Sequence, residues 1–190
     1  MKCIHRTSHV AAQAILNYGF DLDKFGSGAG AGSGEPAGVF VSPGDGDDFA
    51  TENRIRSLGM ESLVEVEFSP KNLVQFGHED RIRKFKECRL DFLRERFGIS
   101  KEDAQAVASF KIRILSSRPD LSKIEEWASS TIGEAEMAKF FSQSLLKQGI
   151  DAVAYRDPWQ SVDQIIILDP GVISSIKPIS AASRHAKPAP

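Results

Sequence analysis

Residues 149–155 read Gly-Ile-Asp-Ala-Val-Ala-Tyr, and residues 162–170 read Val-Asp-Gln-Ile-Ile-Ile-Leu-Asp-Pro. Both apolar runs are short and are bounded by glycine, proline or polar residues, which is typical of β-strands. The second run contains consecutive isoleucines, so it predicts a strand that is covered on both faces at the centre of a sheet. Residues 156–161, Arg-Asp-Pro-Trp-Gln-Ser, are expected to form the loop between the two strands.

A second group of short strands is predicted near the N-terminus. Apolar residues predict strands at 2–4, at 39–42 and at 62–68, and apolar and polar residues alternate along the last of these. Residues 9–17 have helical spacing, and either Thr7 or Ser8 can cap that helix.

Helices are expected between the two groups of strands. Residues 78–96 and 133–148 have helical patterns, and Ser100 caps a further helix. That helix runs to about residue 116, or it gives way to a strand at 110–115, where apolar residues alternate. Asp120 or Ser122 is expected to open the next helical segment, which contains Trp127.

Strands at both ends of the chain with helices between them predict the α+β fold class. We expect one domain over residues 1–180, with a helical insertion at about 77–147. Residues 181–190 are small, polar and proline-bearing, so they predict a disordered tail.

The composition is that of a soluble globular chain. Of the 190 residues 41% are hydrophobic and 26% are charged, so a chain of this length can bury enough apolar surface to form a single hydrophobic core. The net charge of −2 argues against a nucleic-acid binder held by bulk charge. No apolar run reaches the roughly 18 residues of a membrane span, and no secretory signal is readable. We therefore expect no membrane insertion, and a location in the cytoplasm or delivery into a target cell without a cleavable signal peptide.

Three local patterns carry weaker information. Gly32, Gly34 and Ala37 fit the dinucleotide fingerprint, but a helix precedes them and a strand follows, so a flexible loop is the better interpretation. Cys3, His5 and His9 are close in sequence, but no paired His/Cys motif elsewhere supplies the further ligands of a metal site, so no metal is expected. Residues 81–96 carry seven basic and three acidic residues, net +4, which predicts either a solvated helix or a surface for a polyanion.

Three separated pieces together resemble ADP-ribosyltransferase domains of the diphtheria-toxin and poly(ADP-ribose) polymerase kind. The first is His5-Arg6-Thr7-Ser8, followed by a helix that ends in Asn-Tyr-Gly-Phe-Asp at residue 21, and the second is Gly38-Val-Phe-Val-Ser42. The third joins Gly149–Tyr155 to Asp163–Pro170 and the Ile-Ser-Ser-Ile that follows. Leu63–Leu73 fits the family's middle strand.

This resemblance implies a split antiparallel β-sandwich with a helical segment between the strand groups. It implies that NAD is a substrate and that no metal takes part. The expected reaction transfers ADP-ribose to a macromolecular acceptor and releases nicotinamide, in the style of a bacterial toxin or effector. A protein acceptor is preferred to nucleic acid.

The resemblance also assigns the residues that bind NAD. His5 would hydrogen-bond the nicotinamide-side ribose, and the main chain of Arg6 or Thr7 would hold the carboxamide. Phe40 would stack on the nicotinamide, since a phenylalanine ring keeps the π-face of the family's tyrosine. Gly38 and Ser42 belong to the same NAD-binding segment.

Acceptor recognition is implied for the loop that contains Asp157 and Trp159. Pro158 stiffens this loop, and a tryptophan offers the large contact surface that is common in interface hot spots. The other interpretation is that Trp159 covers the edge of the core.

The catalytic carboxylate is the point at which this chain departs from the family. Alignment on the terminal Asp-Pro places Gln164 at the usual glutamate position and Asp163 one residue earlier. Alternation along a strand sends the two side chains to opposite faces, so one of them faces the NAD. With Asp163 there, the chemistry is retained, whereas with Gln164 the enzyme is slow, uses another acid or is inactive. The first alternative to an active transferase is therefore a non-catalytic binding domain of the same fold. A second alternative, independent of the resemblance, is a small RNA-cleaving toxin that uses His5 and the basic residues 81–96.

Overall fold

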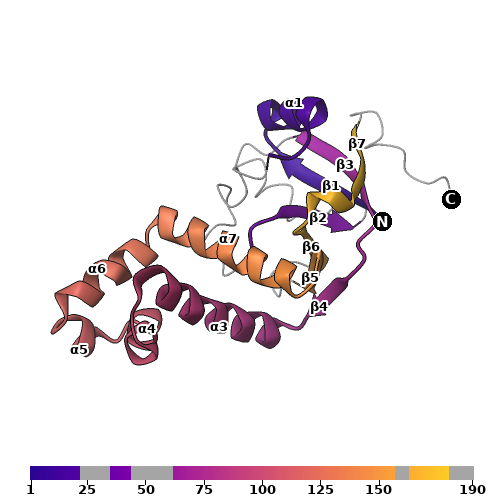
Figure 1. Cartoon of the computed structure of the whole chain (residues 1–190). Coiled ribbons are helices and arrows are strands. Elements are labelled where there is room, and N and C mark those ends of the chain that lie inside the picture. Colours follow the sequence, from indigo (N-terminus) through magenta and orange to yellow (C-terminus); the bar gives the residue numbers. More distant parts are fainter. Residues whose placement is uncertain (22–34, 44–61, 157–162, 180–190) are drawn as a thin grey trace. The chain divides into compact units, whose positions relative to one another are not determined.

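The computed structural model describes four stretches of the chain, which are residues 1–21, 35–43, 62–156 and 163–179 (Figure 1). The contacts divide the chain into two compact units. The first consists of Met1–Asp23, Val39–Gln75 and Ile150–Pro190, and the second consists of Lys24–Gly38 and Phe76–Gly149. The predicted tail at 181–190 lies outside the described residues.

The first unit is built on an open seven-stranded sheet with the strand order β4-β5-β6-β2-β1-β3-β7 (Figure 1). Its elements are β1 (Lys2–Thr7), α1 (His9–Tyr18), β2 (Val39–Pro43), β3 (Ser62–Phe68), β4 (Leu73–Phe76), β5 (Ala152–Arg156), β6 (Asp163–Ile167) and β7 (Ile173–Pro178). With the helices of the second unit this confirms the α+β fold class, with six helices among the described residues.

The prediction that the isoleucine run is a central strand is confirmed. In β6, Ile165, Ile166 and Ile167 are all buried, and the strand lies between β5 and β2. β6 pairs antiparallel with β5 from Ala152↔Ile167 to Arg156↔Asp163, and with β2 from Val39↔Ile167 to Val41↔Ile165. Neighbours on both sides and burial on both faces explain why the run has no polar alternation.

A buried carboxylate fastens the turn before β4 to the start of β5. Asp151 is 8% exposed, and its Oδ2 accepts from the Lys71 N–H at 2.8 Å while its Oδ1 accepts from the Asn72 N–H at 3.1 Å. Its main-chain oxygen accepts from the N–H groups of Leu168 and Asp169. One residue therefore ties three segments of the first unit together.

The second unit is helical. It contains α3 (His78–Phe97), α4 (Lys101–Ala108), α5 (Ile112–Leu115), α6 (Pro119–Ala128) and α7 (Thr131–Lys147). α3 packs along α7 (Figure 1), and Leu93, Leu121 and Ala128 are fully buried between the helices. Trp127 stacks on Phe92 with ring centroids 6.0 Å apart and meets Phe97 edge-on at 5.2 Å.

Two expectations for the helical part are wrong in detail. The strand considered at 110–115 is not formed, because α4 ends at Ala108 and residues 112–115 form the short helix α5. Only Leu115 of its apolar residues is buried, whereas Ile112 is 66% exposed, so the alternation did not mark a buried sheet face. α6 begins at Pro119, before either expected residue, because a proline fits the first position of a helix.

Replacing Asp151 by asparagine should lower the free energy of unfolding by about 2 kcal/mol. Both carboxylate oxygens accept from main-chain N–H groups, so an amide must turn its NH₂ toward one of these donors. Urea denaturation followed by circular dichroism measures the loss. Asp169→Asn is the matched control, since Asp169 is exposed and its Oδ1 accepts the N–H of Gly171 at 2.8 Å, which an amide oxygen can still do. Equal effects of the two variants would contradict this assignment.

Replacing Gly133 by alanine should destabilise the second unit. An alanine Cβ at this position would lie 2.2 Å from the main-chain oxygen of Trp127 and 2.9 Å from the Cα of Ala128. A glycine-to-alanine change within a helix ordinarily gains up to about 1 kcal/mol. Here we expect a loss of about 1–3 kcal/mol from overpacking, measured by the same denaturation experiment. Ser144→Ala on the same helix serves as the control, and a stabilised Gly133→Ala protein would contradict the close approach of α6 and α7.

Candidate functional site

β1 and β2 pair over a short distance and then stop pairing. β1 pairs with β3 along its whole length, from Lys2↔Glu67 to Thr7↔Ser62. Within the described residues its pairing with β2 consists of Cys3↔Pro43 and Ile4↔Ser42. We call the position after this last pair, where His5 follows in β1, the split.

His5 joins the two strands at the split through its side chain. Its Nδ1 lies 2.8 Å from the main-chain oxygen of Phe40, and its ring meets Phe20 edge-on with centroids 5.1 Å apart. Because a carbonyl oxygen can only accept, Nδ1 carries the proton in this bond. Burial lowers the pKa of His5, and the hydrogen bond to Phe40 opposes that shift in part. The ring is therefore neutral at pH 7, and its Nε2 is an acceptor.

Phe40 and Gln164 share one face of the sheet. Phe40 is paired with Ile166, and Gln164 lies two residues before Ile166 in β6. Tyr155 is directly opposite Gln164 in β5, is buried, and donates its hydroxyl hydrogen to Gln164 Oε1 at 2.9 Å. The Gln164 amide is thus held in place by a neighbouring strand.

The remaining NAD-binding residues predicted from the resemblance lie on the same strands. Arg6 and Thr7 continue β1 beyond His5, and Ser42 of β2 is opposite Ile4. Gly38 is buried directly before β2. Because Ile4 is paired with Ser42, strand alternation places the side chains of His5 and Phe40 on opposite faces of the sheet. The two residues meet only through the His5 ring nitrogen and the Phe40 main-chain oxygen.

Three predicted residues cannot be placed in full. Asp157 and Trp159 lie outside the described residues. The backbone of Asp163 begins β6 opposite Arg156, but its side chain lies outside the described part of the chain. The choice between Asp163 and Gln164 as the group that faces the NAD stays a prediction.

The structure adds two residues that were not singled out from the sequence. Phe20 belongs to the quoted Gly-Phe of the first motif, so its contact with His5 could have been sought there. Tyr155 ends the quoted Gly-Ile-Asp-Ala-Val-Ala-Tyr segment, but its partner depends on the register between β5 and β6.

The basic helix α3 is largely an ion-paired helix. Arg83 contacts Asp80 at 2.7 Å and Arg94 contacts Asp91 at 3.7 Å, both at i,i+3 spacing. Two further pairs lead to other segments of the second unit: Arg81 with Glu35 and Arg96 with Glu136. Four of its seven basic residues between 81 and 96 are thus paired, which favours the solvated helix over the polyanion surface.

In the described stretches, no group of three or more His, Cys, Asp or Glu side chains is placed to hold a metal ion. Cys3 and Cys88 are both free and buried, and burial raises the pKa of each thiol, that of Cys88 to about 12. None of the helices that the structure describes is long and apolar enough to cross a membrane. Comparison with protein-family models, with curated proteins and with solved structures found no match to this chain.

The stability of the protein should fall as the pH drops below about 6.5, in part because of His5. The folded state lowers the pKa of this ring, so the unfolded chain takes up the proton first and unfolding becomes more favourable. This contribution is present above the unfolded pKa and is lost as the pH falls through the folded one. Urea midpoints measured between pH 7.5 and pH 5.5 should decline less steeply for His5→Gln than for the natural chain. Parallel curves would show that His5 is not buried in its neutral form.

Proposed function

We propose that the first unit binds NAD at the split and transfers its ADP-ribose to a macromolecular acceptor. The observation that carries this proposal is the adjacency of β1, β2 and β6 in the sheet. These three strands hold the three sequence pieces that resemble ADP-ribosyltransferase domains, although about 160 residues separate the first from the last. The hydrogen bond from His5 to Phe40 joins two of the pieces directly.

The protonation state of His5 suits the role that the resemblance gives it. With Nδ1–H bound to Phe40, the neutral ring presents Nε2, which can accept a hydrogen bond from a ribose hydroxyl. The ring of Phe40 is half-buried, so it keeps a surface on which nicotinamide can stack. The carboxamide is assigned to the main chain of Arg6 or Thr7, on the strand segment where β1 has stopped pairing with β2.

The reaction breaks the bond between nicotinamide and ribose, so positive charge develops on the ribosyl group in the transition state. A carboxylate beside the ribose stabilises that charge, and a neutral amide does so far less. Gln164 is an amide whose oxygen already accepts from Tyr155. We therefore assign the catalytic carboxylate to Asp163 and an orienting role to Gln164.

A second candidate function is NAD binding without transfer. The observation that favours it is the same Tyr155–Gln164 hydrogen bond, which fixes a neutral group at the position where the family has glutamate. In that case the fold presents bound NAD, or a related nucleotide, to a partner and does not turn it over.

NAD labelled on its adenylate half, together with free-nicotinamide analysis, tests the proposal. The natural chain should release nicotinamide and label a protein in an extract. Asp163→Asn should abolish both signals and leave the Kd for NAD nearly unchanged, because its charge acts mainly in the transition state. His5→Ala should weaken NAD binding by about 1 kcal/mol, roughly fivefold.

Gln164→Glu separates the two candidate functions. It keeps an oxygen for the Tyr155 hydroxyl, so the fold should be unaffected, and in the proposed enzyme the activity should be unchanged or lower. A gain of transfer in Gln164→Glu would place residue 164 beside the ribose and support the non-catalytic candidate. Failure of the natural chain to bind NAD would overturn both candidate functions. Cleavage of RNA in the absence of NAD would instead identify the protein as a ribonuclease.

A further inference from the structure

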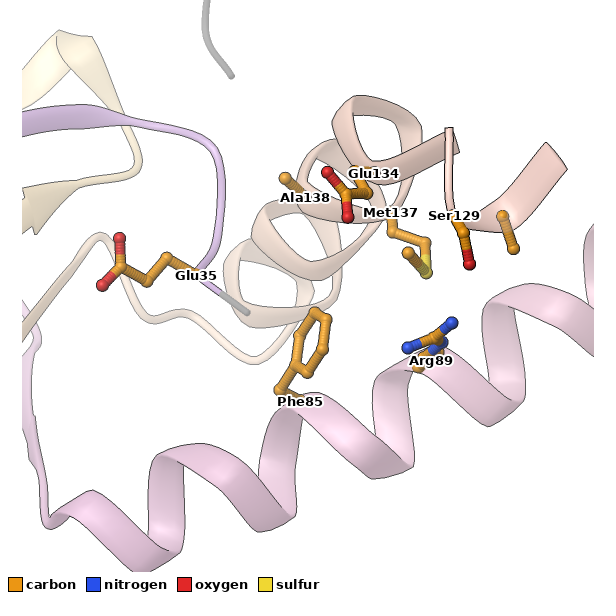
Figure 2. Close-up of a pocket in the computed structure, with 8 residues that line it drawn as sticks. Glu35, Phe85, Arg89, Ser129, Glu134, Met137 and Ala138 are labelled. Carbon is orange, nitrogen blue, oxygen red and sulfur yellow. The ribbon is translucent and has the colours of Figure 1, made fainter. Parts of the chain in front are cut away.

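The second unit contains a cavity between α3, α7 and the end of α6. Its volume of about 90 Å³ is several times the roughly 10–15 Å³ that one water molecule needs by this measure. Figure 2 shows Phe85 and Arg89 rising from α3 toward Glu134 and Met137 of α7, with Ser129 beside the Arg89 guanidinium. Charged and apolar groups thus line the same space.

Arg89 provides a hydrogen-bond donor with nothing to bind. Its Nε is buried, and it has no hydrogen-bond partner among the described residues. Burial lowers the pKa of the Arg89 guanidinium, whereas the charges of Glu125 and Glu134 raise it. The group stays charged, because arginine does not lose its proton in proteins. Arg89 lines the cavity, so an acceptor that reaches its guanidinium group would be bound favourably.

A simple anion does not fit this site, because among the described residues the carboxylates near Arg89 outnumber the cations that line the cavity. The Glu35 carboxylate is 2.8 Å from Arg81, so that pair is neutral. The Glu125 carboxylate accepts the Ser129 hydroxyl hydrogen at 2.7 Å, and the charges of Glu125 and Glu134 both act on the Arg89 guanidinium. Arg89 therefore faces two negative charges, and a ligand that brings an acceptor must bring a positive group as well.

The other walls of the cavity are apolar. Met137 and Ala138 are buried, and the Phe85 ring packs against Phe141 with centroids 6.0 Å apart, which fixes its orientation. A compact aliphatic group fits between an aromatic ring and a thioether, both of which give favourable dispersion contacts.

We propose that this cavity binds a small zwitterion, an α-amino acid with an aliphatic side chain. Its carboxylate accepts from Arg89, its ammonium group is held by Glu134, and its side chain lies against Phe85 and Met137. This site is independent of the function proposed for the first unit, and it needs no reaction of the ligand.

The test is direct binding to the full chain by calorimetry, with L-valine, L-leucine and L-methionine as probes. At least one should bind at millimolar concentration or tighter and raise the melting temperature. For a leucine-sized probe, 4-methylpentanoate lacks the ammonium group and 3-methylbutylamine lacks the carboxylate, and each should bind at least tenfold more weakly. No binding of any of the three amino acids, or equal binding of the carboxylate alone, would overturn the proposal.

Matched variants assign the binding to the cavity. Arg89→Gln and Glu134→Gln should each weaken binding tenfold or more, whereas Arg83→Gln on the exposed side of α3 should leave it unchanged. Circular dichroism establishes that each variant is folded. If Arg89→Gln unfolds the protein, Glu134→Gln still decides the outcome, because it is nearly isosteric. Unchanged affinity in a folded Glu134→Gln protein would show that the amino acid binds elsewhere.

Discussion

β2 is shared between two neighbouring strands, and the rest of the sheet depends on this sharing. Its first three residues pair with β6, and its last two, Ser42 and Pro43, pair with β1. His5 then supplies, from its side chain, the bond to Phe40 that main-chain pairing does not make. Main-chain pairing between β1 and β2 therefore ends at Ile4 and Ser42, and beyond this point the His5 side chain still connects the two strands.

Strong local signals allowed most of the fold to be predicted from the sequence. The run at 165–167 could only be a central strand, and Ser100 caps α4 as expected, with its hydroxyl accepting from the N–H of Asp103. β4 was missed because its short sequence carries no buried apolar pattern and its place depends on tertiary contacts, including those of Asp151. Residues 110–115 led to the wrong expectation of a strand for the opposite reason. Apolar and polar residues alternate there, yet Ile112 faces solvent.

The candidate site was predictable only where a motif carried it. The resemblance predicts that the side chains of His5 and Phe40, 35 residues apart, line one site. The structure brings the His5 ring to the main-chain oxygen of Phe40, but strand alternation places the two side chains on opposite faces of the sheet. The partnership of Tyr155 with Gln164 depends on a register that no local pattern specifies. Arg89 was one of seven basic residues on a predicted helix, and only packing distinguishes it from its ion-paired neighbours.

His5, Phe40 and Gln164 are the uncharged residues to which the resemblance assigns NAD binding or catalysis near the split. His5 is held neutral by burial, Phe40 offers a π-face, and Gln164 offers an amide fixed by Tyr155. In the proposed NAD complex these groups would contact the nicotinamide and the ribose, but none of them carries the negative charge that a ribosyl cation requires. In the proposed enzyme, the rate of transfer would therefore depend on a carboxylate beside the ribose, whereas the affinity for NAD would not.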